Sequence, residues 1–228
     1  MALKRRPPQN NVRRAKTNSQ NSWGVMTNQL GETTQYESDK EKIMAYKLKR
    51  DPNVARFISQ PFVIHFVDDQ GKKHQYTPDY EVHFKDGRVE IQEFSLTKRR
   101  KELSIQRREE AAKKYCVNKG WTYRVLTEQD LPSLTEIANL RTLHGYSPTS
   151  YYQHAVAEKI LSKLEDGLNV NILDLSTQIA LELDMPQALV HNTLFHMIWH
   201  ALVAFDPNVL LFIDGTPNRK AKVWNKGS

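Results

Sequence analysis

The sequence predicts an α/β domain followed by a smaller and mostly helical domain. Residues 62–95 are rich in β-forming side chains and are interrupted by glycine-containing turns. Amphipathic stretches of helical period flank this region, and one more strand is predicted at residues 121–126. This order allows a mixed sheet with helices on its faces, and a length of 228 residues suits one large domain or two small ones.

The N-terminal segment, residues 1–35, is basic and polar with few apolar side chains. Such a segment buries too little surface to offset its loss of conformational entropy, so we predict a disordered arm. Its cations either lie along DNA phosphates or only solubilise the chain. They include Arg5, Arg6, Arg13 and Arg14.

A first helix is predicted over residues 36–50, because Glu41, Ala45 and Leu48 fall on one face at helical spacing. Pro52 ends it, since the residue before a proline is disfavoured in the helical conformation. Glu41 is a carboxylate on an otherwise apolar face, which makes it a candidate ligand. An acidic residue also suits the start of a helix, where it complements the dipole.

Residues 61–95 are predicted to form a three-stranded antiparallel meander. The first strand, residues 62–67, ends in an Asp-Asp-Gln-Gly turn. The second strand opens at Pro78-Asp79, and an Asp-Gly hairpin signal leads from it to the third strand at residues 88–95.

A basic cluster at residues 98–101 leads into a second helix, which Gly120 ends at the C-terminal cap. A strand at residues 121–126 and a helical connector at residues 130–146 follow. Because a Ser-Pro-Thr sequence then breaks the helical pattern, we place the domain boundary there. The first domain covers residues 36–146 and the second covers residues 147–228.

The second domain is expected to be winged-helix-like. Its predicted helices cover residues 151–164, 174–183 and 187–204. The last two are joined by a three-residue turn, as in a helix-turn-helix, and residues 209–213 and 222–224 are predicted to pair as a β-wing. The expected recognition helix has no arginine or lysine, so protein docking is as well supported as DNA binding.

The composition limits the functional classes. A net charge of +7 and a pI of about 9.4 fit nucleic-acid binding if the charge is clustered, and otherwise only a basic surface. The single cysteine, Cys116, excludes an internal disulfide and fits a reducing cytoplasm. The apolar runs fall short of the roughly 18 residues that span a bilayer, so no membrane association is expected. There is no glycine-rich phosphate loop, so the chain is not itself an ATPase.

Two histidines, His196 and His200, have the spacing of metal ligands on one helix face. Neither a HExxH pattern nor a nearby cysteine accompanies them. Core or surface positions are therefore better supported than a zinc site.

The residues that carry chemistry lie around the Pro-Asp hairpin. Cutting a phosphodiester needs a positioned water, a charge clamp on the phosphate and an acid for the leaving oxygen. Mg²⁺, or Mn²⁺ in its place, supplies most of this when two or three carboxylates hold it. Asp79 and Glu93 can meet across the hairpin, and Glu41 would be a third ligand. Candidates for contacting DNA phosphates nearby are Lys72, Lys73, His74, Lys98, Arg99, Arg100 and Lys101.

The motifs resemble a known family. Glu41 in a helix, then Gln60-Pro61-Phe62, then Tyr76-Thr77-Pro78-Asp79 before an acidic strand resembles TnsA. TnsA is the endonuclease subunit of a heteromeric cut-and-paste DNA transposase. The resemblance covers about residues 36–146, and the C-terminal domain only by its type.

The resemblance implies a restriction-endonuclease-like PD-(D/E)xK core that cuts the 5′ ends of a transposon. It implies three partners: transposon-end DNA, a DDE-type, TnsB-like transposase that cuts and joins the 3′ ends, and an AAA+, TnsC-like ATPase contacted by the C-terminal domain. It also implies a place in the bacterial cytoplasm, on the nucleoid when bound to DNA.

The resemblance implies catalytic roles for Glu41 and Asp79 and leaves two registers for the next strand. Counts from the preceding turn and from the following helix end both place the family's acid at Glu93 and its lysine at Ser95. A shift by one residue would give Gln92 and Phe94 instead, and it would turn every side chain to the other face. The agreement of the counts favours Glu93, although it puts Glu90 and Gln92 on the face that should be apolar.

In either register the motif lysine is missing, because Ser95 carries no charge. Three outcomes are open: Lys98 substitutes from the next helix start, the site works without a lysine, or the protein binds DNA and partners but cuts poorly. The alternatives to a Mg²⁺-dependent endonuclease are therefore a catalytically weak or inactive adaptor that binds DNA ends, and a stand-alone restriction-like nuclease.

Overall fold

The computed structural model describes residues 24–165 and 169–226. The chain forms two compact units, Met1–Leu131 and Pro132–Ser228. Within the described ranges, no helix is both long enough and apolar enough to cross a membrane.

The N-terminal unit is built on a four-stranded sheet in the order β3-β6-β7-β8. Its strands are β3 (Val54–Ser59), β6 (Tyr80–Phe84), β7 (Val89–Phe94) and β8 (Thr122–Leu126). β6 is antiparallel to both β3 and β7, whereas β8 runs parallel to β7. A parallel pair needs a crossover connection, which α2 (Leu103–Lys119) provides. The sheet is therefore mixed, as predicted.

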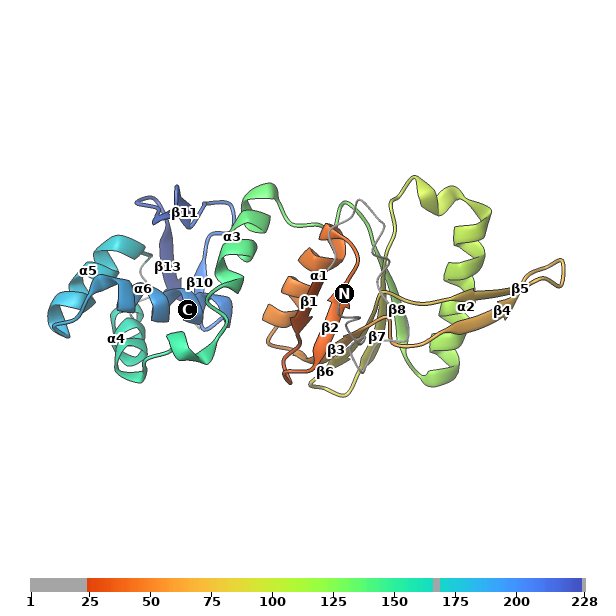
Figure 1. Cartoon of the computed structure of the whole chain (residues 1–228), viewed down its shortest axis with the longest axis horizontal. Helices are drawn as coiled ribbons and strands as arrows, with labels where there is room; N and C mark the ends of the chain where they lie inside the picture. Colours follow the sequence, from red (N-terminus) through yellow and green to blue (C-terminus); the bar gives the residue numbers. More distant parts are fainter. Residues whose placement is uncertain (1–23, 166–168, 227–228) are drawn as a thin grey trace, which may run out of the picture. The chain divides into compact units, whose positions relative to one another are not determined.

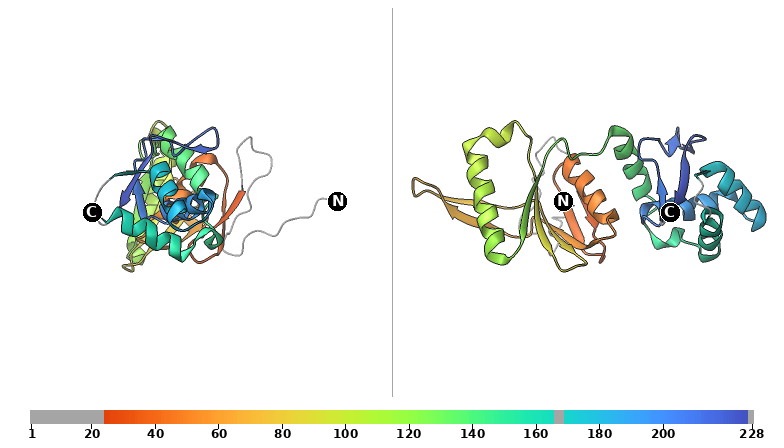
Figure 2. Two further views of the ribbon diagram at one scale, coloured as in Figure 1. Left: turned by 90° about the vertical axis from the view of Figure 1, so that its left-hand side faces the viewer. Right: turned by 180° about the vertical axis from the view of Figure 1, so that it is seen from behind.

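Helices α1 (Asp39–Arg50) and α2 lie on opposite sides of this sheet (Figures 1 and 2). On the α1 side, the buried Tyr80 donates its hydroxyl to the carbonyl of Glu41 at 3.0 Å and meets the Phe57 ring edge-on. The other face buries Ile91. Because β6 and β7 are covered on both faces, the backbone that carries the candidate acids is held in place.

A separate two-stranded hairpin, β4 (Ile64–Val67) and β5 (Lys73–Tyr76), runs out past α2 (Figure 1). Among the described strands, β4 pairs with β5 and not with β6, so the predicted three-stranded meander is wrong, although its hairpin of β6 and β7 is confirmed. Thr77-Pro78 interrupts the pairing, because proline has no N–H to donate to the ladder. The place beside β6 belongs to β3, where no strand was predicted.

Residues 24–36 form a second hairpin from β1 (Gly24–Thr27) and β2 (Thr33–Tyr36). The prediction of a disordered arm is therefore wrong for residues 24–35. Side chains near this hairpin bond to β3: Asn28 donates to the Phe57 carbonyl at 3.0 Å, and Thr34 donates to the Ser59 hydroxyl at 2.7 Å. The arm cations Arg5, Arg6, Arg13 and Arg14 lie outside the described residues.

The C-terminal unit combines helices with very short strands. In chain order its elements are α3 (Leu134–His144), the 3-10 helix η2 (Thr149–Tyr151), α4 (His154–Leu164), β9 (Val170–Asn171), α5 (Ile172–Glu182), α6 (Gln187–Trp199), β10 (Val203–Phe205), β11 (Phe212–Ile213), β12 (Thr216–Pro217) and β13 (Lys222–Asn225). β13 lies between β10 and β9 in a three-stranded sheet, and β11 pairs with β12.

The predicted pairing of residues 209–213 with 222–224 is wrong. α6 ends at Trp199, before the predicted end, and the chain then enters the sheet, where Val203 and Phe205 alternate as buried side chains. β13 therefore pairs with β10, and the Asp-Gly turn joins only the short strands β11 and β12.

Helix α3, which the sequence assigned to the first domain as a connector, packs in the C-terminal unit. The side chain of Asn139 accepts from the Leu211 N–H at 2.8 Å and donates to the Val209 carbonyl at 2.9 Å. The His144 ring meets the Trp199 ring edge-on at 5.3 Å. The boundary between the units therefore lies before α3 and not after it.

We predict that Asn139→Ala lowers the free energy of unfolding of the C-terminal unit by about 2 kcal/mol, because it leaves buried backbone groups of Val209 and Leu211 unpaired. Calorimetric unfolding measures the change. Asn208→Ala, at an exposed position, is the matched control. Equal stability of the two variants would contradict the packing of α3 in this unit.

Candidate active site

The register of β6 and β7 brings two carboxylates together. Tyr80 pairs with Gln92 and Glu81 pairs with Ile91, so Asp79 and Glu93 stand opposite each other and point to one face. Gln92 points to the other face. Its Nε2 donates to Glu90 Oε1 at 2.8 Å, which also explains how this polar pair is accommodated there.

Glu93 is buried and is held at both carboxylate oxygens. Oε2 accepts from the hydroxyl of Tyr76, and Oε1 accepts from Arg108 Nη2 of α2 at 2.8 Å. The Arg108 guanidinium lies over the Tyr76 ring, 4.8 Å from its centroid. Burial raises the pKa of Glu93 to about 7, although the Arg108 charge and the Tyr76 hydrogen bond oppose the shift.

Asp79 is held through both its side chain and its backbone. Oδ2 accepts from the Phe94 N–H at 2.8 Å, and the carbonyl accepts from the Gln60 N–H at 2.8 Å. Removal from water, followed by the charges of Glu93 and Glu41, raises the pKa of Asp79 well above its usual value. The two acids therefore sit in a place that favours a proton or another positive charge.

The Gln60-Pro61-Phe62 motif positions the backbone of Asp79. Gln60 has a left-handed backbone with φ of 47°, which directs its N–H to the Asp79 carbonyl. Its side chain accepts from Gln35 of β2 at 2.9 Å, and the Phe62 ring stacks on Tyr115 of α2 at 4.9 Å. The motif thus ties β2 and α2 to the residue that opens β6.

Glu41 lies in the first turn of α1, where its carboxylate takes part in capping the helix. It accepts from the Glu37 N–H at 2.8 Å and from the Ser38 hydroxyl at 2.9 Å, and Ser38 Oγ accepts from the Glu41 N–H. The helix starts at Asp39, later than predicted, because Tyr36 belongs to β2. The Glu41 charge nevertheless raises the pKa of both Asp79 and Glu93, so it is close enough to influence them.

A divalent cation fits this donor set in part. In the described part of the chain, no three His, Cys, Asp or Glu side chains are placed to hold a metal ion as they stand. Asp79 and Glu93 offer the oxygen ligands that Mg²⁺ and Mn²⁺ prefer, and their pKa values are raised mainly by burial, with a further contribution from the charge of Glu41. Glu41 would have to leave its capping contacts to join them.

The expected lysine position supplies no positive charge. Ser95 is buried beside the end of β8, where its N–H donates to the Leu126 carbonyl at 2.9 Å. Lys98 is exposed just before the 3-10 helix η1 (Arg99–Lys101), and no hydrogen bond or ion pair in the described residues joins it to Asp79 or Glu93. Among the described residues, Arg108 forms an ion pair with Glu93.

Sequence reasoning did not single out Arg108 or assign a role to Tyr76. A signal for Arg108 exists, because Arg108, Ala112 and Tyr115 share one face of α2 at i, i+4 and i+7 spacing. Ala112 and Tyr115 pack toward the sheet in one cluster, so an arginine on that face points to a buried acid.

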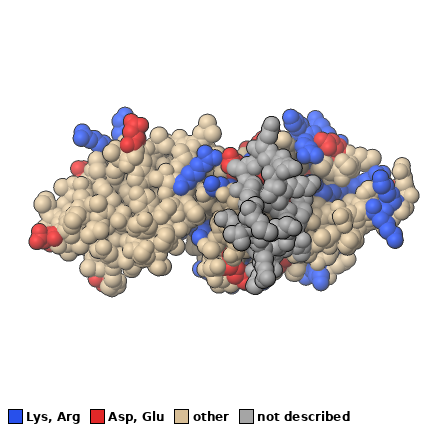
Figure 3. All heavy atoms as spheres, viewed as in Figure 1, with Lys and Arg blue, Asp and Glu red and all other residues tan. Residues whose placement is uncertain are grey.

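The predicted phosphate contacts separate into two groups. Arg100 is paired through two 2.9 Å bonds with the buried Glu109, Arg99 with Glu102 at 3.4 Å, and His74 with Asp68 at 2.8 Å. The exposed lysines, which have no ion pair in the described residues, are Lys72, Lys73, Lys98 and Lys101. Figure 3 shows Lys and Arg side chains near η1 and the β4–β5 hairpin, so this unit keeps a basic surface.

The C-terminal histidines are engaged with the protein. His196 Nδ1 bonds to the Tyr146 carbonyl at 2.9 Å, and His200 Nε2 bonds to the Ser147 carbonyl at 3.1 Å. His191 Nε2 bonds to Ser176 Oγ at 2.8 Å. These bonds are those of structural histidines.

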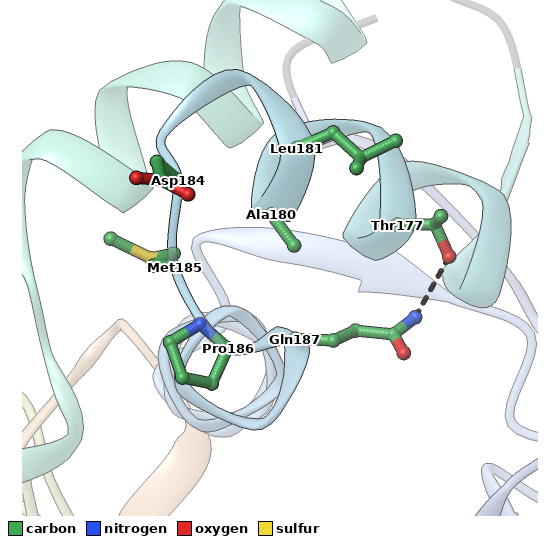
Figure 4. Close-up of a pocket in the computed structure, with 7 residues that line it drawn as sticks. All are labelled: Thr177, Ala180, Leu181, Asp184, Met185, Pro186 and Gln187. Atoms are coloured by element: carbon green, nitrogen blue, oxygen red, sulfur yellow. Dashed lines mark hydrogen bonds between the residues drawn. The ribbon is translucent and has the colours of Figure 1, made fainter.

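A hollow lies between α5 and α6 (Figure 4). It is lined by Thr177, Ala180, Leu181, Asp184, Met185, Pro186 and Gln187. Asp184 is the one charged residue of the seven, and Gln187 Nε2 donates to Thr177 Oγ1 at 2.9 Å. The lining therefore offers neither a pair of acids nor a cation for phosphate chemistry.

Comparison with known proteins gives one family match. The family model described as TnsA-like endonuclease N terminal matches residues 51–128. A search of curated proteins found no significant match. The matched segment includes Asp79, Glu93 and Arg108; it begins after Glu41 and ends before the C-terminal unit.

We predict that the metal-free N-terminal unit loses stability as the pH rises from about 5 to about 8. A carboxyl whose folded pKa is raised stabilises the fold below its unfolded pKa, and this contribution is lost as the pH rises through the folded value, about 7 for Glu93. Asp79→Asn removes one charge and keeps an oxygen for the Phe94 N–H. The free energy of unfolding of this variant should exceed that of the wild type by roughly 1–3 kcal/mol at high pH, and it should vary less with pH.

Thermal unfolding in EDTA across this pH range measures the effect. Asp86→Asn, in the exposed turn of the same hairpin, is the control and should follow the wild type. If the stability of the wild type and that of Asp79→Asn change with pH in the same way, the buried carboxylates do not destabilise the folded state at high pH.

Proposed function

We propose that this chain is a Mg²⁺-dependent DNA endonuclease that cuts the 5′ ends of a transposon, because residues 51–128 match the family model of the TnsA-like endonuclease N-terminal domain. The observation that carries the proposal is the Asp79–Glu93 pair, two partly or fully buried carboxylates on one face of adjacent strands. A metal-dependent nuclease needs such a pair, and buried acids with raised pKa values cluster at functional sites.

In this proposal Asp79 and Glu93 would hold the metal ion, and Glu41 would be a third ligand if its carboxylate left the helix cap. Such an ion would supply charge stabilisation for the phosphate and a lower pKa for the attacking water. The Phe94 N–H and the Gln60 N–H fix Asp79, so little reorganisation is required of that ligand. Mn²⁺ would serve as well, since its ligands are of the same kind.

The proposed partners follow from the family. They are transposon-end DNA, a DDE-type, TnsB-like transposase for the 3′ ends, and an AAA+, TnsC-like ATPase. The exposed lysines near η1 and the β4–β5 hairpin would approach DNA phosphates. The protein would act in the bacterial cytoplasm, on the nucleoid when it is bound to DNA.

We assign the C-terminal unit to the winged-helix-like class, with a docking role. The order α4, β9, α5, α6, β10, a small hairpin and β13 supports the assignment. α6 carries no lysine or arginine. Gln187 and His191 form hydrogen bonds with Ser176 of α5, and Phe195 is buried. The helix therefore offers few side chains that could contact DNA. A protein partner such as the ATPase fits this surface better.

A second candidate function is a DNA-end-binding adaptor that cuts poorly or not at all. Two observations favour it: the neutral Ser95 stands where the family has a lysine, and the carboxylates of Glu41 and Glu93 are already hydrogen-bonded. A stand-alone restriction-like nuclease is a third candidate, and efficient cutting by the isolated chain would favour it.

We predict that Asp79→Ala lowers 5′-end cutting by at least about 100-fold, because metal ions contribute several kcal/mol to phosphate chemistry. The assay uses the full chain with the transposase and ATPase of its own element, a DNA carrying the transposon ends, and Mg²⁺. Asp86→Ala, in the exposed turn, is the matched control and should cut normally.

Undiminished cutting by Asp79→Ala would exclude the proposed active site. If the wild type gives no Mg²⁺-dependent 5′ cut but is still needed for cutting at the 3′ ends, the adaptor function is correct instead.

A further inference from the structure

Arg108 carries a positive charge that contacts the candidate acid Glu93. Its Nη2 donates to Glu93 Oε1 at 2.8 Å, and its charge also counteracts the raised pKa of Asp79. It projects from α2, which is independent of the hairpin that carries the two acids. Arg108 therefore brings a positive charge to one of the two proposed metal ligands from a separate element.

The guanidinium has binding capacity that the described residues do not use. An arginine has five N–H donors, and the bond to Glu93 uses one of them. Nε is buried without a hydrogen-bond partner among the described residues, while the side chain as a whole is 28% exposed. The Tyr76 ring, 4.8 Å away, supports one face of the planar group. Because Nε is buried, the donors available to a ligand are the terminal N–H groups that the bond to Glu93 leaves unused, and their fixed and partly exposed fork suits an oxyanion.

We propose that Arg108 binds the phosphate that is cut, and so supplies the positive charge that Ser95 does not. The inference rests on the proposed nuclease function. Its ligand is a phosphodiester oxygen of DNA, because two parallel N–H groups of arginine match the geometry of phosphate.

The neighbouring arginines are already committed to other acids. Arg107 pairs with Asp68 at 3.5 Å and with Asp69 at 3.2 Å, which anchors the β4–β5 hairpin. Arg100 donates two hydrogen bonds to the carboxylate of Glu109. Arg108 differs from both because its partner is a candidate metal ligand.

The salt dependence of DNA binding tests the contact. Each phosphate contact contributes about 0.9 to the slope of log Kd against log salt concentration. We compare Glu93→Gln with the double variant Glu93→Gln/Arg108→Gln, since in that background Arg108 no longer balances a buried charge and its removal should not unfold the chain. The probe is a 30-base-pair duplex, measured with the full chain in EDTA so that no cutting occurs.

The proposal predicts that the slope falls by about 0.9 when Arg108 is removed. The charge-matched control is Arg88→Gln in the same background, because Arg88 is exposed at the opposite end of the β6–β7 hairpin and pairs with Asp86. That variant should keep the slope. If removal of Arg108 also leaves the slope unchanged, Arg108 is only a counter-ion of Glu93 and the proposal is wrong.

The result of the salt-dependence test can be distinguished from the result of the cutting assay with Asp79→Ala. If Asp79→Ala does not cut and the slope is insensitive to Arg108, the nuclease assignment stands and the phosphate contact fails. If Asp79→Ala cuts like the wild type, the nuclease site itself is misplaced, whatever the slope.

Discussion

The structure of the N-terminal unit depends on keeping two like charges side by side away from water. Asp79 and Glu93 face each other across adjacent strands, and burial raises both pKa values; the charges of Glu93 and Glu41 raise that of Asp79 further, and the charge of Glu41 raises that of Glu93. The protein offsets this cost locally, with the Arg108 guanidinium and the Tyr76 hydroxyl on Glu93 and the Phe94 N–H on Asp79. The fold therefore holds a site with a deficit of positive charge, which is a property expected of a metal-dependent nuclease and not of a stable core.

The surrounding elements make this arrangement rigid. β2 reaches Gln60 through Gln35, and Gln60 fixes the backbone of Asp79. Phe62, two residues on, stacks against α2, the helix that delivers Arg108. A hairpin, a strand end and a crossover helix thus converge on one acid pair. Stability and function are opposed here, because the change that relieves the repulsion also removes a proposed metal ligand.

The parts of the fold that sequence predicted best are those set by local chemistry. The Asp-Gly turn fixes the β6–β7 register, so the pairing of Asp79 with Glu93 followed from counting residues. Long amphipathic stretches predicted α1 and α2, but not the residues at which the helices begin, because capping contacts determine those. The parts that sequence missed depend on distant contacts. β1 and β2 are ordered by bonds to β3, β3 itself is identified only by its pairing with β6, and α3 joins the C-terminal unit through Asn139.

Arg108 was missed for a related reason. Its position on α2 is visible in the sequence, but its partner lies 15 residues away on another element, and no local pattern connects the two. Ser95 therefore looked like a simple loss of charge. In the folded chain, a cation approaches the same acids from the crossover helix, which keeps a role in cutting compatible with the neutral serine.

The most direct measurement of the central claim is the affinity of the full chain for Mn²⁺, followed by the electron paramagnetic resonance of the free ion at neutral pH. The account predicts that the wild type binds Mn²⁺, and that Asp79→Asn weakens this binding at least about 10-fold, since loss of a charged ligand costs over 1.4 kcal/mol. Asp86→Asn, in the turn at the far end of the same hairpin, should bind as the wild type does. Equal Mn²⁺ affinity in the wild type and Asp79→Asn would contradict the claim that these carboxylates form a metal site.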